Sequence, residues 1–316
     1  MRILVTGGQG FIGGRLIQYL MQAGHQIDLG SRTVASSPPW APQASVVQMD
    51  WLDRRSLELV CTGVDVVIHA AGMNAQDCSA DPVAALDFNG VATARLAASA
   101  NSAGVSQFIY LSTAHVYASP LVGAITEDTC PRNVHCYAAS HLAGENAVLA
   151  HNHNGSMTGI VLRLSNAFGV PVHRDVNCWM LLVNDLCRQA VTSRSLVLRT
   201  AGLQKRDFVT LTDVSRAISH VINLNGERIG NAILNVGGAW APSVLDMAKI
   251  IQTRCSVILG YTPNIACLDQ IDAEVTVDLE YNIARLLSSG YSLTGQSIAE
   301  IDSLLIFCSE NFEQIS

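Results

Sequence analysis

The sequence contains few charged residues and no cluster of basic ones. Only 14% of the 316 residues are Asp, Glu, Lys or Arg, and the formal net charge is -7. A nucleic-acid-binding surface needs a concentration of Lys and Arg to neutralise phosphates, so nucleic acid is not expected as a partner. Hydrophobic residues make up 49% of the chain, which is enough for a large core and for two lobes.

Long apolar runs are also missing. No run reaches the roughly 18 residues that a membrane span needs. The amino-terminal stretch "MRILVTGG" is short, ends in a glycine turn and lacks the small-residue cleavage site of a signal peptide. We therefore expect a cytoplasmic protein with no membrane partner.

The nine cysteines are scattered along the chain, and none of them forms a C-x-x-C pair. Single cysteines in a chain without an export signal indicate reduced thiols. No metal site is expected either. His151 and His153 are two residues apart, a spacing that suits no common pair of helical metal ligands.

Short apolar runs alternate with Ala- and Leu-rich helical stretches. The predicted strands cover residues 2–7, 25–31, 45–50, 64–72, 107–113, 158–166 and 231–238, and predicted helices cover 11–24 and 178–190. This alternation predicts an α/β fold, a doubly wound parallel sheet with helices on both faces.

The pattern becomes irregular from about residue 170, and the tail 243–316 reads as mixed short helices. We therefore predict two parts. Residues 1–166 and 206–240 form a dinucleotide-binding domain. Residues 167–205 and 241–316 form a smaller, mixed α/β lobe that binds the substrate.

The first predicted strand leads into "VTGGQGFIGGRL", in which Gly7, Gly10 and Gly13 are spaced G-x-x-G-x-x-G. After a strand and before a helix, such glycines allow a tight turn, close approach of the backbone to a pyrophosphate, and close packing of the helix on the sheet. The helix N-terminus supplies N–H groups and positive potential for the phosphates. The motif predicts a Rossmann fold and an NAD or NADP site that includes Phe11 and Ile12.

The choice between NAD and NADP depends on the end of the second predicted strand. An acidic residue there would bind the ribose 2′-hydroxyl of NAD, but the chain has Ser31 and Arg32. Arg binds phosphate with paired donors, so the sequence slightly favours NADP, unless Arg32 is an ordinary exposed charge. Asp50 is a candidate acceptor for the adenine amino group or else a loop cap, and Ala70 and Ala71 complete the predicted cofactor site.

The stretch "CYAASHLAGE" (136–145) reads as the opening turns of a helix. Tyr137 and His141 are four residues apart and therefore share one helical face. They form a candidate acid–base pair.

Taken together, these segments resemble the extended short-chain dehydrogenase/reductase family, of the NAD-dependent epimerase/dehydratase type. The resemblance covers most of the chain. It is carried by the glycine motif (6–13), "DVVIHAAG" (65–72), "DFNGVATARLAASA" (87–100), "FIYLSTAHVY" (108–117), "YAASHLAGE" (137–145), "LRLSNAFGVP" (162–171), "KRDFVTLTDV" (205–214) and "LNVGG" (234–238).

The resemblance implies roles for single residues. Thr113 stands at the family's catalytic Ser/Thr position and would hydrogen-bond the reacting oxygen. Tyr137 stands at the catalytic tyrosine, which exchanges a proton with a substrate hydroxyl while hydride moves to or from the nicotinamide. Asn166 lies where the family lines the boundary between cofactor and substrate, and Arg206 matches an arginine that often contacts the diphosphate of a nucleotide sugar. Asn89 is expected to be a local structural hydrogen-bond partner.

The chain departs from the family's Tyr-x-x-x-Lys pattern, because the fifth residue is His141. In the family, the lysine favours tyrosinate and binds the nicotinamide ribose. A tyrosine with an ordinary pKa of about 10 needs a shift of about three units, or ~4 kcal/mol, to work near pH 7. A histidine is mostly neutral there and supplies little of this, although its ring can donate one hydrogen bond to a ribose hydroxyl.

Three alternatives follow for the site. The protein is a detuned but active enzyme, or its chemistry uses other groups, or it binds a dinucleotide without turnover. The retained Thr113 and Tyr137 favour activity. We expect His141 to belong to both the catalytic and the cofactor-binding set.

The sequence motifs indicate the family more clearly than they indicate the reaction. The family's 4,6-dehydratases have an Asp-Glu pair directly after the catalytic Thr, where this chain has Ala114 and His115. Without a carboxylate there, dehydration is disfavoured. The resemblance favours a nucleotide-sugar epimerase that works by transient hydride transfer at a carbinol carbon, whereas Ser31 and Arg32 favour an NADPH-dependent ketone or keto-sugar reductase.

Two further expectations concern the substrate and the assembly. Nucleotide-sugar members often carry a second arginine shortly before an Asp, which Asp278 fits. Residues 272–277 contain no arginine, so Arg174 or Arg285 would have to replace it. Family members often pair through two helices that correspond to 88–104 and 137–152, which are rich in small residues on faces expected to be exposed. We therefore predict a homodimer.

Overall fold

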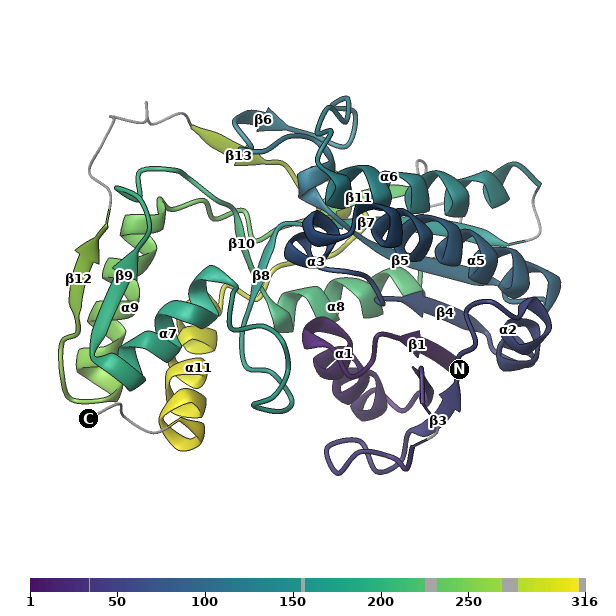
Figure 1. Ribbon diagram of the computed structural model, residues 1–316, viewed down its shortest axis with the longest axis horizontal. Coiled ribbons are helices and arrows are strands. Elements are labelled where there is room, and N and C mark those ends of the chain that lie inside the picture. Colours follow the sequence, from purple (N-terminus) through teal and green to yellow (C-terminus); the bar gives the residue numbers. More distant parts are fainter. Residues whose placement is uncertain (34, 155–156, 225–231, 269–277, 313–316) are drawn as a thin grey trace.

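The computed structural model shows an α/β fold built around a seven-stranded parallel sheet (Figure 1). It describes residues 1–33, 35–154, 157–224, 232–268 and 278–312. The strands lie in the order β11-β7-β5-β4-β1-β2-β3. Their bounds are β1 Arg2–Thr6, β2 Gln26–Ser31, β3 Ser45–Gln48, β4 Val66–His69, β5 Gln107–Thr113, β7 Thr158–Leu164 and β11 Ile233–Val236. The predicted fold class is confirmed.

Both faces of this sheet are covered by helices, as its continuous apolar strands require. Side chains alternate between the faces. Ile3 and Val5 of β1 pack with α1 (Phe11–Gln22) and α8 (Leu211–Ile222), whereas Leu4 packs with α2 (Arg54–Cys61) and α5 (Thr93–Ser102). Figure 1 shows α5 and α6 (Cys136–Leu149) on one side of the sheet and α1 and α8 on the other.

Short elements connect these layers. They are α3 Ala75–Ala80, α4 Pro82–Ala85, the π-helix η1 Leu86–Ala92, and the 3-10 helices η2 Ala114–Val116 and η3 Ala150–Asn154. The helix expected at 88–104 is thus divided between η1 and α5. None of the helices in the described part of the chain combines the length and the apolar character of a membrane span.

A second hydrophobic cluster lies beside the sheet domain. It is built from α7 (Leu182–Ser193), α9 (Val244–Ile258) and α11 (Ser297–Asn311), with the paired strands β9 (Ser195–Leu198) and β12 (Asn264–Cys267). Figure 1 shows these elements together, away from the large sheet.

Two expectations about this region are wrong. The helix predicted at 178–190 begins only at Leu182, because Cys178 and Leu181 are joined by a backbone hydrogen bond in the preceding turn. The tail is not made of short helices alone, since α9 and α11 have 15 residues each. Their apolar residues fill the second cluster, and this long-range packing extends the helices.

Two further strand pairs join the parts of the molecule. β8 (Asn166–Phe168) pairs with β10 (Phe208–Thr210), and β6 (Gly123–Ile125) pairs with β13 (Leu279–Tyr281). The short helix α10 (Ala284–Ser288) follows β13.

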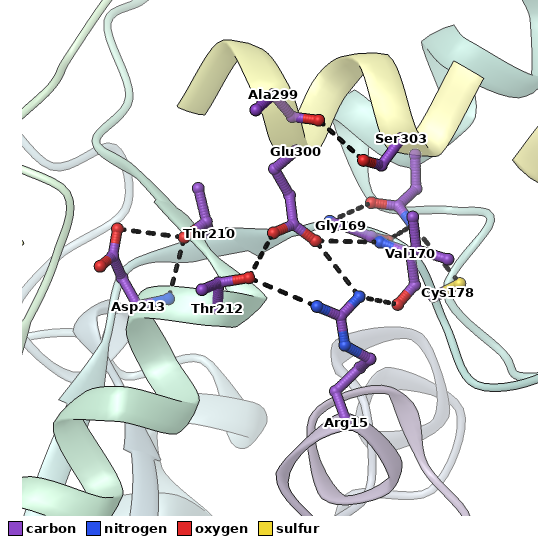
Figure 2. Close-up of polar contacts among 11 residues, drawn as sticks. Arg15, Gly169, Val170, Cys178, Thr210, Thr212, Asp213, Ala299, Glu300 and Ser303 are labelled. Carbon is purple, nitrogen blue, oxygen red and sulfur yellow. Dashed lines mark hydrogen bonds and ion pairs between the residues drawn. The ribbon is translucent and has the colours of Figure 1, made fainter. Parts of the chain in front are cut away.

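Arg15 of α1 and Glu300 of α11 connect the sheet domain to the second cluster (Figure 2). Arg15 Nη1 lies 3.3 Å from Glu300 Oε1 and donates to the carbonyl oxygen of Val170 at 2.9 Å. Glu300 also accepts from the hydroxyl of Thr212 at 2.6 Å and from the N–H of Val170 at 3.4 Å. The buried carboxylate therefore holds three segments that are distant in sequence.

Candidate functional site

The carboxyl ends of three neighbouring strands bring most of the predicted site residues to one edge of the sheet. β1 leads into the glycine motif, β4 leads into Ala70 and Ala71, and β5 ends at Thr113. In an open parallel sheet this edge is where ligands bind. The first turn of α6, which bears Tyr137, contacts the same edge through Thr113.

The glycine motif leaves no room for larger residues at two of its positions. Gly7 has φ +68°, and a Cβ there would lie 2.6 Å from the backbone of Ala70. A Cβ at Gly13 would collide with the backbone of Gly7. The turn is therefore as tight as a dinucleotide site requires.

The start of α1 is an uncapped helix terminus. Its N-cap residue, Gly10, makes no side-chain cap, and the first turn carries no acidic residue. Phe11 and Ile12 are partly exposed there. Free N–H groups and the helix dipole at this point suit a phosphate, so the residues present fit a dinucleotide.

The residues predicted to contact the adenosine part of the cofactor differ in exposure and in their hydrogen bonds. Ser31 is buried at the end of β2, where its hydroxyl accepts from the N–H of Thr33 at 3.2 Å, and Arg32 beside it is exposed. Asp50 accepts from the N–H of Leu52 at 3.0 Å, which is the loop-cap role. Ala71 donates its N–H to the hydroxyl of Thr6 at 3.4 Å.

A cavity of about 610 Å³ adjoins the glycine motif rather than Tyr137. Its walls are the glycine loop, the loop that contains Pro38 and Pro39, and the segment after β8. The lining residues are Gln9, Pro38, Pro39, Trp40, Val172, His173, Asp175 and Val176.

Thr113 and Tyr137 meet at the edge of the sheet. Tyr137 is the second residue of α6, and its N–H donates to Nδ1 of His135, the N-cap residue, at 3.2 Å. Burial raises the pKa of Tyr137, and a hydrogen bond with Thr113 partly offsets this effect. Thr113 itself is buried and accepts from the N–H of His115 at 3.1 Å.

His141 lies one turn later on α6. Its ring centroid is 4.6 Å from that of Tyr137, and its Nδ1 is 2.8 Å from the hydroxyl of Tyr110. Burial lowers the pKa of His141 to about 4. The imidazole is therefore neutral at pH 7 and does not supply the positive charge that would favour tyrosinate.

A chain of buried polar groups continues from Tyr110 beneath the cofactor loop. The hydroxyl of Thr93 donates to the carbonyl oxygen of Asn89 at 2.7 Å. His69 joins Thr93 at 2.9 Å through Nε2 and Thr6 at 2.6 Å through Nδ1. Burial, with a contribution from His141, lowers the pKa of His69 to about 3.

Asn89 anchors this chain locally. Its side chain accepts from the N–H of Met73 at 2.8 Å and donates to the hydroxyl of Ser140 at 3.0 Å. These contacts agree with the structural role expected for it.

Three other polar residues border the site. The ring of His115 is 6.4 Å from that of Tyr137. His115 is exposed at its surface, but the pKa of its ring is lowered. The main cause is desolvation by the surrounding protein, and the positive charge of Arg206 adds to it. Arg206 donates to Gln204 at 3.2 Å, and Asn166 donates to the carbonyl oxygen of Asp207 at 2.9 Å.

Arg285 and Arg174, the candidates for a second phosphate-binding arginine, differ in their surroundings. Arg285 lies 3.1 Å from the carboxylate of Asp128. Arg174 is exposed. Asp278 pairs with Lys205 at 2.6 Å, and residues 272–277 lie outside the described residues.

Sequence reasoning missed the contribution of Tyr110 and His69. A signal was present, because His69 ends an otherwise apolar strand and Tyr110 lies within the apolar run of residues 108–111. A buried tyrosine hydroxyl or imidazole in such a strand must find a hydrogen-bond partner. The identity of that partner depends on how the helices dock on the sheet.

The profile of the NAD dependent epimerase/dehydratase family matches residues 3–237. A putative UDP-glucose 4-epimerase of Methanocaldococcus jannaschii is 27% identical over 254 residues, which cover 79% of this chain and 81% of that protein.

Solved structures agree with this match. An NAD dependent NDP-hexosamine 5,6-dehydratase, TunA, involved in tunicamycin biosynthesis, is 25% identical with a TM-score of 0.79 over 98% of both chains. The UDP-glucuronic acid 4-epimerase of Bacillus cereus, solved with UDP-glucuronic acid and NAD, has a TM-score of 0.80 over 99% of this chain and 100% of that chain. At 21% identity, this second likeness concerns the fold alone. The chain belongs to the NAD dependent epimerase/dehydratase family.

Proposed function

We propose that the chain is an NAD(P)-dependent epimerase of a nucleotide sugar, with Tyr137 as the acid and base. The observation that carries this proposal is the meeting of Thr113 and Tyr137 at the sheet edge that also bears the glycine motif. The likeness to a putative UDP-glucose 4-epimerase supports a nucleotide sugar as the substrate.

A nicotinamide dinucleotide bound at the glycine motif would supply reversible hydride transfer. In its tyrosinate form, Tyr137 would take the proton of a carbinol hydroxyl when the carbon is oxidised, and Thr113 would hydrogen-bond the same oxygen. Tyr137 would return the proton when the carbon is reduced from its opposite face, which inverts the centre.

The proposed cofactor site uses three parts of the sheet domain. The glycine motif and the start of α1 hold the pyrophosphate, the ends of β2 and β3 face the adenosine, and the end of β4 with α6 faces the nicotinamide ribose. The residues are Gly7, Gly10, Phe11, Ile12, Gly13, Ser31, Arg32, Asp50, Ala70, Ala71, Tyr137 and His141. The two solved structures named above are described with NAD, and they give no support to the slight preference for NADP.

The proposed substrate site lies between the two parts of the molecule. We assign the lobe of residues 167–205 and 241–316, which contains the second cluster, to substrate binding. Asn166 and Arg206 would face the sugar nucleotide from the boundary between the parts, together with Thr113. The assembly is proposed to be a homodimer.

The test begins by denaturing the purified protein and identifying any dinucleotide that it releases. The stripped protein is then titrated with NAD and NADP and incubated with UDP- and dTDP-hexoses in D2O. Epimerisation returns the same hydrogen to the carbinol carbon, so we expect an inverted sugar without deuterium and no product from Tyr137→Phe. Elimination of water would introduce deuterium from solvent.

Two other outcomes would contradict an epimerase. Reversible, preferential NADP binding with net reduction of a keto-sugar would support the reductase, and Arg32 would then bind the 2′-phosphate. Dinucleotide binding without any turnover would support a non-catalytic protein in which the loss of the lysine has abolished the chemistry.

A further inference from the structure

The two ring nitrogens of His141 have different surroundings. Nδ1 lies 2.8 Å from the hydroxyl of Tyr110, whereas Nε2 has no hydrogen-bond partner among the residues that the structure describes. The edge formed by Cε1 and Nε2 lies against Gly72, where a Cβ would be 3.5 Å from Cε1 and 3.8 Å from Nε2. Gly72 is exposed, whereas His141 itself is buried, so the Cε1–Nε2 edge lies just beneath an accessible stretch of backbone and on the same helix face as Tyr137.

The hydroxyl of Tyr110 can serve as a donor to Nδ1. Tyr110 is buried in β5, and burial raises its pKa well above the ordinary value, so it keeps its proton. The carbonyl oxygen of Asn89, the alternative acceptor, is 3.5 Å away and already accepts from Thr93 at 2.7 Å. The shorter contact, to His141, is therefore the favoured one.

We infer that Tyr110 is a positioning residue that holds the imidazole of His141 in the Nε2–H form. His141 then offers a hydrogen-bond donor, and no charge, to a hydroxyl group bound beside Tyr137 and Gly72. Only the identity of that hydroxyl, a ribose hydroxyl of the dinucleotide, rests on the proposed function.

The surroundings of the pair favour the neutral ring. His69 of β4 stacks on Tyr110 with ring centroids 5.6 Å apart and is itself held by Thr6 and Thr93. The nearby carboxylate of Glu145 is engaged by Arg163 at 2.6 Å. Protonation of His141 would remove the acceptor that Tyr110 uses, without gaining an unpaired carboxylate as a partner.

The tautomer can be measured without substrate or cofactor. The protein is labelled with 15N-histidine, and long-range 1H–15N correlation spectra are recorded at pH 7. Comparison with His141→Asn identifies the signals of His141. We expect a protonated Nε2 and an unprotonated Nδ1 in the wild type, and a mixture of both tautomers in Tyr110→Phe.

Tyr117→Phe is the matched control. Tyr117 is equally buried, but its hydroxyl donates to Asn235 at 2.7 Å and not to a histidine, so this variant should keep the wild-type tautomer. A wild type with the proton on Nδ1, or a Tyr110→Phe spectrum unchanged from wild type, would overturn the inference. Should Tyr110→Phe fail to fold, the wild-type spectrum still tests the inference, because a proton on Nδ1 would overturn it.

Dinucleotide affinity gives a second readout. Removing the hydroxyl that orients a single hydrogen-bond donor should weaken NAD(P) binding about threefold to tenfold in Tyr110→Phe. A tautomer that changes in Tyr110→Phe, found in a protein without turnover, would contradict the proposed function and support this inference. Turnover by a protein whose His141 tautomer is the same in Tyr110→Phe would support the proposed function and contradict this inference.

Discussion

The imidazole of His141 meets the ring of Tyr137 edge-on, with an interplanar angle of 70° and centroids 4.6 Å apart. Burial acts on the two residues in opposite directions, raising the pKa of Tyr137 and lowering that of His141 to about 4. Both side chains are therefore neutral at pH 7. The site keeps the geometry of an acid–base pair but lacks the charge that would ionise the tyrosine.

His141→Lys should raise turnover near pH 7. An ammonium group one turn from Tyr137 favours tyrosinate, so the limb on which kcat/KM rises with pH should move to lower pH. Each unit by which the pKa of Tyr137 falls should increase the rate on that limb about tenfold. The pH profile of kcat/KM is measured with the substrate found in the D2O assay. His141→Gln, which adds no charge, is the control, and a lower rate in His141→Lys would refute the idea of a detuned enzyme.

His69 and His141 should make the fold sensitive to acid. Their pKa values are lowered to about 3 and about 4, whereas the unfolded chain has values near 6.5. The stabilising effect is present in full above about pH 6.5 and is lost as the pH falls toward the folded values. Between pH 7.5 and pH 5 we expect a loss of ~4 kcal/mol, about half from each residue.

Urea unfolding at the two pH values measures this loss. His141→Asn should show about half of the acid sensitivity. The control is His173→Asn, because His173 has a side chain that is 57% exposed and should leave the difference unchanged. Equal acid sensitivity in all three proteins would mean that the buried imidazoles do not cause it.

The sequence predicted those parts of the structure that depend on residues close to one another along the chain. The apolar runs gave β1, β2 and β5 nearly to the residue, and the glycine spacing placed the turn before α1, because strand burial and tight turns are local properties. The order of the motifs was enough to recognise the family that the profile match then confirmed.

The polar contacts across the fold could not be predicted in the same way. Tyr110 and His141 meet only because α6 docks on β5 in one register. Arg15 and Glu300 are 285 residues apart, and their pairing depends on how the second cluster packs against α1. Such contacts follow from tertiary packing, which no short pattern encodes.

The predicted dimer surface needs a correction before it is tested. Small residues of the helix predicted at 88–104 were expected on an exposed face, but two of them, Ala97 and Ala100 of α5, are fully buried against α2 and the sheet. The exposed apolar residues lie instead on α4 and η1, where Val83, Leu86 and Val91 are 72%, 50% and 45% exposed. Since η1 packs beside α6, we expect the two copies to meet over η1 and α6.

Leu86→Glu should therefore convert a dimer into a monomer. Burying a carboxylate in an apolar interface is unfavourable without a partner, and sedimentation velocity at micromolar concentration measures the mass. Leu59→Glu is the control, because Leu59 is 68% exposed on α2, away from η1. A monomeric wild type, or a dimer that persists in Leu86→Glu, would contradict this assembly.

Glu300 and Arg15 together bind both the N–H and the carbonyl oxygen of Val170 (Figure 2). Two residues further on, Val172 packs against Gly14, where a Cβ would lie 2.5 Å from its Cγ2. The pair thus fixes the segment that leads from the sheet domain to the second cluster, over the start of the cofactor helix.

Glu300→Gln keeps the shape of the side chain but removes the charge that faces Arg15. We expect a loss of about 1–3 kcal/mol in the free energy of unfolding, because a charged hydrogen-bond partner is lost at a buried position. Glu310→Gln is the control, since Glu310 lies exposed near the end of the same helix. Because the segment leads to the proposed substrate lobe, Glu300→Gln should raise KM for the sugar nucleotide more than it lowers kcat. An unchanged KM with a reduced kcat would show that Glu300 acts on the chemistry and not on the placement of the second cluster.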